Sequence, residues 1–180
     1  MWYDVWNALI FSAKHFLGVK NQMEKLSTCC FTGHRKIPAN KIQHIIERLN
    51  QEIDNLINQG VTNFISGGAV GFDQVAASLL VAKKEMGKDI RLIFALPCKN
   101  QDKLWNTDQK KLYHDLLAKA DEVIYISEKE YYDGCMKERN YYMVDQSAHC
   151  ICALANSRSG TAQTVRYAMQ EGLNVINLFK

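Results

Sequence analysis

The sequence predicts an α/β protein with a Rossmann-like, doubly wound fold: a mainly parallel sheet of about six strands with helices on both faces. Short apolar runs alternate with longer amphipathic runs from residue 28 onward, and this alternation is typical of strands joined by helices. The short runs lack a polar side, as expected of parallel strands buried between two layers of helices. Ligands of such sheets bind at the carboxyl ends of the strands, so we look for function in the loops that follow them.

The individual elements follow from local patterns and from the residues that begin or end them. Runs rich in β-branched and aromatic residues predict strands at residues 28–32, 61–66, 90–96, 122–127, 149–155 and 174–179. Apolar residues at helical spacing predict helices at residues 38–58, 72–86, 107–119, 135–147 and 161–171. Pro38 suits the first turn of its helix, Pro97 ends a strand, and Gly60, Gly87 and Gly172 suit helix ends.

The composition is that of an ordinary globular domain. The 180 residues are 47% apolar and 23% charged, and residues 23–180 contain no repeat or linker, so we expect a single domain there. The net charge of +3 is too small to indicate nucleic acid by itself. No apolar run reaches the length of about 18 residues that an integral membrane segment needs.

The six cysteines fit the buried thiols of a cytoplasmic protein better than a metal site. No Cys-x-x-Cys pair is present. His149 lies next to Cys150 and Cys152, but successive residues of a strand point to opposite faces, so Cys150 and Cys152 share one face and His149 points to the other. Cys98 follows a strand without a recognisable base, which argues against a catalytic thiol. We expect no metal and no required cofactor.

Residues 1–22 form an amphipathic N-terminal extension. At helical spacing, one face carries the apolar residues Trp2, Trp6, Leu9, Ile10, Ala13, Phe16 and Leu17. Three interpretations remain open: a helix that docks on protein, a helix that lies on a membrane surface, or an upstream extension before a start at Met23. We favour docking, because an exposed Trp and Phe stripe is otherwise a liability, and because Lys14 and Lys20 supply little charge for a membrane surface.

The most informative stretch is Ser66-Gly67-Gly68-Ala69-Val70-Gly71-Phe72-Asp73, between a predicted strand and a predicted helix. A glycine-rich turn there lets the backbone approach a ligand, and it aims N–H groups and the positive end of a helix at an anion. Neither the dinucleotide-binding fingerprint nor the P-loop pattern is complete, so a turn that needs glycine only for its shape is the alternative. Asp73 would satisfy N–H groups of its own helix or bind a ribose hydroxyl.

Two further loops carry side chains that suit a nucleotide. Arg35 is placed to pair with a phosphate, and His34 to donate a hydrogen bond or titrate near neutral pH; a plain polar turn is the alternative. In residues 96–105, Gln101 and Trp105 are one helical turn apart and are expected to share a face. The indole would stack on a base or belong to the core.

The loop at residues 156–161 is a second candidate anion site. Gly160 and Thr161 begin a helix there, and Arg139 and Asn140 of the preceding helix would point at the same crevice. Two helix N-termini that face each other across a switch point indicate a ligand more specifically than one. The expected ligand-binding residues are Thr32, Gly33, His34, Arg35, Ser66, Gly67, Gly68, Gly71, Asp73, Pro97, Gln101, Trp105, Arg139, Ser159, Gly160 and Thr161.

These loops together resemble the SLOG superfamily, and within it the YpsA-like branch of small bacterial and phage proteins. The matching segments are CCFTGHR (29–35), SGGAVGFDQVAA (66–77), LPCKNQDKLW (96–105), KERNYYMVD (137–145) and SGTAQTVRYA (159–168). The resemblance covers about residues 23–180, and Met23 is similar to a usual start for this branch. It implies a Rossmann-like domain that recognises nucleotides or nucleotide-derived ligands.

Two relatives in that superfamily frame the functional alternatives. Lonely-guy phosphoribohydrolases have a motif similar to P-G-G-x-G-T-x-x-E with a catalytic glutamate, and Thr164 stands at that position here. A threonine neither helps a base leave nor stabilises an oxocarbenium-like ribose, so a hydrolase would need Asp73, Glu138 or Asp145 instead. DprA-like domains bind single-stranded DNA, which calls for a basic groove with aromatic platforms, whereas the basic residues here are scattered among acidic ones.

We therefore expect a cytoplasmic protein that binds a nucleotide or an ADP-ribose-like ligand in a sensing or regulatory role, with no catalytic residue assigned. A nucleoside-monophosphate phosphoribohydrolase-like enzyme is the first alternative, and a protein-interaction or single-strand DNA-binding module is the second. A homodimer or a protein partner stays open, whereas nucleic acid is not an expected partner.

Overall fold

The computed structural model describes residues 22–179, which form a six-stranded, all-parallel sheet with flanking helices. The strands are β1 (Thr28–Gly33), β2 (Asn63–Ser66), β3 (Arg91–Leu96), β4 (Glu122–Tyr125), β5 (His149–Ala153) and β6 (Asn174–Asn177). The helices are α2 (Ala39–Asn58), α3 (Phe72–Glu85), α4 (Thr107–Ala118), α5 (Cys135–Asp145) and α6 (Gly160–Gln170). The apolar stripe predicted between Trp2 and Leu17 lies outside the described residues.

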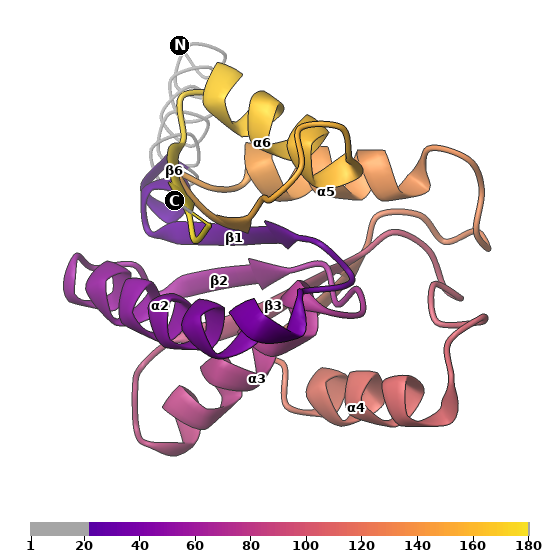
Figure 1. Cartoon of the computed structure of the whole chain (residues 1–180), viewed down its shortest axis with the longest axis horizontal. Coiled ribbons are helices and arrows are strands. Elements are labelled where there is room, and N and C mark those ends of the chain that lie inside the picture. The colour runs from indigo at the N-terminus through magenta and orange to yellow at the C-terminus, as the bar shows by residue number, and fades with distance from the viewer. Residues whose placement is uncertain (1–21, 180) are drawn as a thin grey trace, which may run out of the picture.

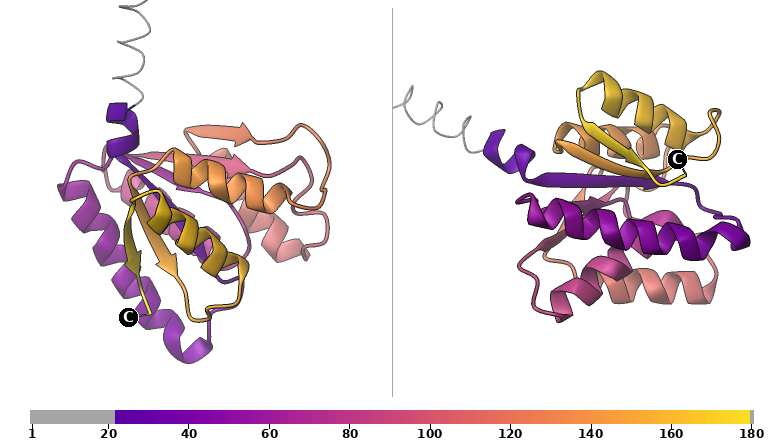
Figure 2. Two further views of the ribbon diagram at one scale, coloured as in Figure 1. Left: turned by 90° about the horizontal axis from the view of Figure 1, so that it is seen from above. Right: turned by 60° about the vertical axis from the view of Figure 1, so that its left-hand side comes forward.

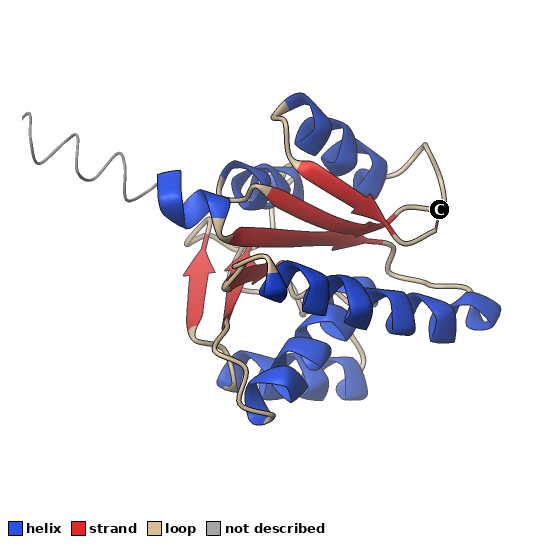
Figure 3. Ribbon diagram, turned by 90° about the vertical axis from the view of Figure 1, so that its left-hand side faces the viewer, coloured by secondary structure: helices blue, strands red, loops and turns tan. Residues whose placement is uncertain are grey.

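The strand order β4-β3-β2-β1-β5-β6 confirms the predicted doubly wound fold. From β1 the chain winds in one direction to β4, and it then crosses back to add β5 and β6 on the other side of β1. Because parallel crossovers keep one hand, this reversal sends α2, α3 and α4 to one face and α5 and α6 to the other (Figures 1 and 2). Figure 3 shows the strands between the two helical layers.

Two cores hold these layers together. The larger core joins the sheet to α2, α3 and α4, and Phe31 stacks in it on Phe64 with ring centroids 6.1 Å apart. The smaller core joins the opposite face to α5 and α6 and contains Cys30, Cys150 and Cys152. All six cysteines are buried, as predicted. Within residues 22–179, no helix combines the length and the apolar character needed to cross a membrane.

The predicted boundaries agree with the structure to within two residues, and the ends of β5 and β6 are among those that differ. Both strands stop two residues before the predicted ends at 155 and 179. The Asn177 side chain accepts a hydrogen bond from the Leu154 N–H and donates one to the Leu154 carbonyl, each 3.1 Å long. The Asn177 side chain thus takes the place of the backbone hydrogen bonds between β5 and β6 at this point. The apolar pattern of the sequence does not show where this exchange occurs.

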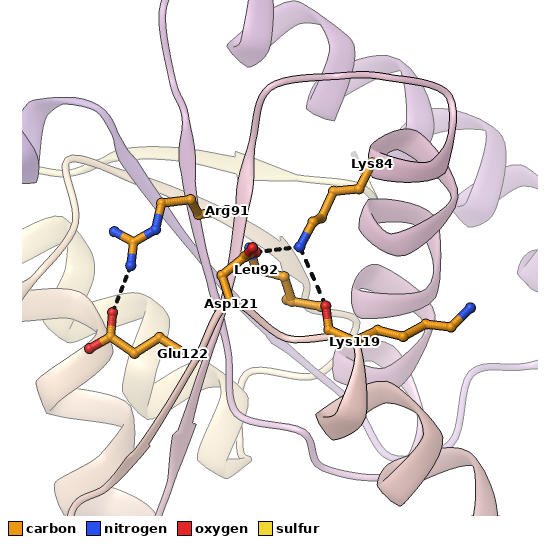
Figure 4. Close-up of polar contacts among 6 residues, drawn as sticks. All are labelled: Lys84, Arg91, Leu92, Lys119, Asp121 and Glu122. Atoms are coloured by element: carbon orange, nitrogen blue, oxygen red, sulfur yellow. Dashed lines mark hydrogen bonds and ion pairs between the residues drawn. The ribbon is translucent and has the colours of Figure 1, made fainter.

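A cluster of hydrogen bonds joins the amino-terminal edge of β3 and β4 to α3 (Figure 4). The Asp121 carboxylate accepts hydrogen bonds from the Leu92 N–H at 2.7 Å and from the Lys84 ammonium at 2.5 Å. Lys84 also donates to the Lys119 carbonyl at 3.4 Å. Partial burial alone would raise the pKa of Asp121, but the bonds from Lys84 and Leu92 together outweigh it and lower the pKa.

Asp121→Asn is expected to lower the free energy of unfolding by about 1 kcal/mol at pH 7, because one charge-assisted hydrogen bond is lost. The folded-state pKa of Asp121 is lowered, so its contribution is present above the unfolded pKa near 3.8 and disappears as pH falls through the folded value. Urea unfolding at pH 7 and pH 3 measures both effects. Glu122→Gln, which breaks only the exposed pair with Arg91, is the control, and an equal loss there would contradict the prediction.

Candidate functional site

The switch point lies between β1 and β5, and the loops that follow these strands are joined there. The Ala155 N–H donates a hydrogen bond of 3.1 Å to Nε2 of His34. His34 therefore accepts through this nitrogen. Thr32 is buried within β1 opposite Cys152, and Gly33 ends the strand. Arg35, the next residue after His34, is exposed.

The glycine loop, residues 67–71, connects β2 to α3 and is held by its own polar groups. The buried Ser66 hydroxyl donates to the Asp73 carbonyl at 3.1 Å and accepts from the Gly68 N–H at 3.2 Å. Gly71 has a φ of 95°, a conformation that favours glycine, and a Cβ there would overlap the backbone carbonyl of Arg35. The close approach of this loop to the loop after β1 therefore requires glycine.

A buried carboxylate and a buried guanidinium flank the backbone of Gly67. Asp73 and Arg139 are 6% and 4% exposed, so both charges are shielded from water. The Gly67 and Ala69 N–H groups donate to the Asp73 carboxylate, and Arg139 Nη1 donates to the Gly67 carbonyl. A Cβ on Gly67 would overlap the guanidinium. The Gly67 peptide thus bridges two opposite charges that do not form a direct ion pair.

Burial raises the pKa of Asp73 to about 6, against the opposing charge of Arg139 and the hydrogen bonds from Ala69 and Gly67. Burial also lowers the pKa of Arg139, although the negative charge of Asp73 acts in the other direction. The carboxylate therefore satisfies N–H groups of its own loop and helix. The N–H groups of Gly67, Gly68 and Ala69 are engaged inside the loop, and the structure does not turn them toward the switch point as the sequence predicted.

The loop after β3 packs behind the glycine loop. Gln101 is 7% exposed, and its Nε2 donates to the Tyr113 hydroxyl at 2.9 Å and to the Gly67 carbonyl at 3.4 Å. The Gln101 Oε1 is buried without a protein partner among the described residues. Trp105 packs edge-on against Tyr113 with ring centroids 5.2 Å apart, and Pro97 is buried. These contacts place Gln101 and Trp105 against the core.

The expectation that Gln101 and Trp105 share a helical face is wrong. Residues 97–105 form turns, and α4 begins only at Thr107, after Asn106. Asn106 accepts from the Gln109 N–H at 2.9 Å, and the Gln109 side chain accepts from the Asn106 N–H. This capping box sets the start of the helix, and it could have been recognised in the sequence from Asn106 and Gln109. Tyr113, which sequence analysis missed, is on the buried face of α4.

The N-terminus of α6 lies on the loop that follows β5. The Ser159 hydroxyl caps the helix by accepting from the Ala162 N–H at 3.1 Å. Gly160 is exposed, and a Cβ there would meet no other atom within 4 Å, so this end of the helix is open. Thr161 is buried. The exposed Arg158, which the candidate residues omitted, precedes this helix.

The carboxylates proposed for a rearranged hydrolase do not gather in one place. Thr164 is buried, donates to the Gly160 carbonyl at 3.0 Å and accepts from Asn140 at 3.0 Å, so it supports α6. Asp145 ends α5 at the opposite, amino-terminal edge of the sheet, where it lines a cavity with Thr28 and Asn63. Glu138 is exposed and accepts from the Tyr132 hydroxyl. Only Asp73 lies within the candidate site.

The family follows from comparison with known proteins. The family model YpsA, described as the YspA SLOG family, matches residues 29–175, which include every loop of the candidate site. The chain belongs to the YpsA family of SLOG proteins. This membership confirms the resemblance found in the sequence.

Two curated members illustrate the family. The uncharacterised SPbeta prophage-derived protein YoqJ of Bacillus subtilis (strain 168) is 36% identical over 113 residues, which are 57% of this chain and 66% of YoqJ. The UPF0398 protein BH1768 of Halalkalibacterium halodurans is 31% identical over 107 residues, which are 59% of this chain and 57% of that protein. The matched segment thus spans less than two thirds of either relative.

Solved structures share the fold. DNA processing protein A of Helicobacter pylori, whose structure describes a single-stranded DNA binding mode, has a TM-score of 0.62 at 21% identity, over 88% of this chain and 67% of that one. DNA processing protein A of Streptococcus pneumoniae has a TM-score of 0.63 at 20% identity, over 85% and 50%. These identities establish likeness of fold.

The expectation that nucleic acid is not a partner is wrong. A solved protein of this fold binds single-stranded DNA, so the sequence argument did not justify excluding nucleic acid. The argument failed because it judged basic residues by their spacing in the sequence. Parallel strands bring the loops after them to one edge of the sheet. Exposed basic residues in those loops therefore share an edge despite their separation in the chain: Arg35, Lys36, Lys99, Lys103, Lys129 and Arg158.

Proposed function

We propose that this domain binds a nucleotide unit through its phosphate at the switch point, in a sensing or regulatory role. The proposal rests on the N-terminus of α6, which is open at Gly160 and follows the loop after β5. The His34 side chain joins that loop to the loop after β1 by accepting a hydrogen bond from the Ala155 N–H. The first-turn N–H groups of a helix and its dipole attract an anion. Arg35 and Arg158, exposed on the two joined loops, add positive charge to the same place.

The buried polar groups support this site from behind rather than contacting the phosphate. Asp73 and Arg139 hold the glycine loop from both sides of Gly67, and Gln101 contacts the same backbone. This arrangement fixes the start of α3 beside Arg35. We therefore assign ligand contact to Arg35, Arg158 and the start of α6, and positioning to the buried groups.

Single-stranded DNA is the second candidate ligand, favoured by the fold shared with the Helicobacter pylori protein. Its repeating phosphates present the same chemistry as a free nucleotide, and the basic loops lie along one edge of the sheet. Binding of DNA is expected to weaken steeply as salt concentration rises, because several counterions are released, whereas a single nucleotide shows a shallow dependence.

Arg35→Ala is expected to weaken binding of AMP, ADP-ribose or oligothymidylate about tenfold, the effect of one charge-assisted hydrogen bond of about 1.4 kcal/mol. Calorimetric titration at two salt concentrations measures the affinity and separates the two ligand classes. Arg91→Ala removes an exposed arginine at the opposite edge of the sheet and is the matched control.

Gly160→Asp provides a second test of the same site. The new carboxylate lies in open space at the N-terminus of α6, where it favours the helix but repels a bound phosphate. We expect binding to be lost while the unfolding midpoint is unchanged or higher. Absence of binding by the unmutated protein at millimolar concentrations of all three ligands would refute the proposed function.

A further inference from the structure

Two cysteines from different elements, Cys98 and Cys135, are neighbours in the folded protein. Cys98 is in the loop after β3, and Cys135 is the first residue of α5. Their thiols are hydrogen-bonded to each other, and the Cys98 thiol also donates to Oδ1 of Asn100 at 3.6 Å. Both cysteines are free, and the proposed nucleotide site uses neither of them. The pair is therefore a dithiol with no role in ligand binding.

A single loop, residues 126–134 between β4 and α5, is bonded to the chain on both sides of this pair. The Tyr131 N–H donates to Oδ1 of Asn100 at 2.8 Å, which fixes the loop to the segment that follows β3. The Cys135 N–H donates to the Tyr132 carbonyl at 3.2 Å, which fixes the same loop to the start of α5. These two bonds, from adjacent residues of one loop, keep the two thiols close together.

The surroundings of this pair differ from those of the other cysteine neighbours, Cys30 and Cys150. Those two thiols are also hydrogen-bonded to each other, but they lie on the adjacent strands β1 and β5 inside the smaller core. A reagent reaches them only when the sheet opens. Cys98 is followed by the exposed Lys99, and Cys135 is preceded by the exposed Gly134. Local opening of the loop is enough to admit a reagent to this pair.

We propose that Cys98 and Cys135 form a reversible disulfide by exchange with a low-molecular-weight disulfide. One thiolate of the pair attacks a sulfur of the reagent, and the first reagent thiol leaves. The second thiolate attacks the resulting mixed disulfide, and the second reagent thiol leaves. The two cysteines thus lose two protons and two electrons, and the reagent gains them. A disulfide brings the sulfur atoms to about 2.05 Å, so the loop after β3 must shift slightly toward α5.

The disulfide would join two parts of the chain beside the candidate site. Cys135 and Arg139 are four residues apart on α5, both are buried, and they share a face of the helix. Arg139 donates to the Gly67 carbonyl of the glycine loop. The bond would therefore fix the first turn of α5 to the loop after β3, next to a group that positions the glycine loop. Burial raises the pKa of the Cys98 thiol, so exchange is expected to be faster at pH 9 than at pH 7.

The test treats the folded, unmutated chain with glutathione disulfide at pH 8. Remaining thiols are then alkylated, and the chain is digested without reductant for mass spectrometry. We expect one cross-linked pair of peptides, containing Cys98 and Cys135, with the loss of two hydrogen atoms and full reversal by dithiothreitol. Cys30 and Cys150 of the same sample are the internal comparison, and we expect both to be alkylated.

Variants identify the thiols that react. Cys98→Ala and Cys135→Ala should each abolish the internal bridge, whereas Cys152→Ala, which removes a thiol of the smaller core, should leave the rate of bridge formation unchanged. Urea unfolding of each variant shows whether it is folded. If a variant does not fold, the unmutated chain still decides the question. Cys98 and Cys135 that stay reduced, or that react no faster than the whole domain unfolds, would overturn the proposal, as would an equally fast bridge between Cys30 and Cys150.

Discussion

Gly71→Ala is expected to lower the free energy of unfolding by about 3 to 5 kcal/mol. Two costs combine at this position. The φ of 95° is a conformation that alanine rarely adopts, and the new Cβ overlaps the backbone carbonyl of Arg35. Neither backbone moves freely, because the Phe72 N–H donates to the His34 carbonyl at 3.3 Å and ties the start of α3 to the loop after β1. Urea unfolding followed by circular dichroism measures the loss.

Gly87→Ala separates the two costs. Gly87 has a φ of 84°, but a Cβ there meets no other atom within 4 Å. The variant carries backbone strain without overlap, so a loss of about 1 kcal/mol is expected. If both variants lose the same stability, the close approach of the glycine loop to Arg35 contributes nothing, and Gly71 is present for its conformation alone.

Arg139→Met is expected to lower the free energy of unfolding by about 3 to 5 kcal/mol at pH 8, because it leaves the buried Asp73 carboxylate without its nearest cation. Methionine fills much of the same volume but removes the bond to the Gly67 carbonyl. The pKa of Asp73 rises above its present value of about 6 when the opposing charge of Arg139 is gone.

The loss of unfolding free energy in Arg139→Met is expected to depend on pH, because Asp73 titrates in the folded protein. The folded-state pKa of Asp73 is raised, from 3.8 to about 6, so its contribution is fully present below about pH 4 and is lost as pH rises through 6. In Arg139→Met the folded-state pKa of Asp73 is higher, so the contribution of Asp73 to stability continues to fall up to a higher pH. The difference in unfolding free energy between the parent and the variant should therefore be smaller at pH 5 than at pH 8, as measured by urea unfolding at both values.

Two further variants identify the cause. Asp73→Asn added to Arg139→Met should recover part of the stability at pH 8, because the unpaired buried charge is removed. Arg91→Met breaks an exposed pair with Glu122, and a loss below about 1 kcal/mol is expected there. A pH-independent loss in Arg139→Met, without recovery in the double variant, would mean that the guanidinium acts through packing alone.

Much of the fold could be predicted because each strand and helix has its own signal in the sequence. The buried face of α2, at Ile45, Leu49, Ile53 and Leu56, has the helical spacing that predicted it. Prediction of strand ends was weaker, because the end of β5 depends on Asn177 of β6, which is distant in the chain. The shared helical face expected for Gln101 and Trp105 was wrong, because their spacing is equally compatible with a compact turn.

The sequence by itself determined the doubly wound fold, the family and the loops that meet at one edge, because periodicity and glycine placement are local properties of the chain. Only the tertiary structure decided which groups of those loops face inward. It buried Arg139 against Gly67, used the loop N–H groups for Asp73, and turned His34 into an acceptor for Ala155. The physical reason is that a buried polar group must find a partner, and these partners come from elements far apart in the chain.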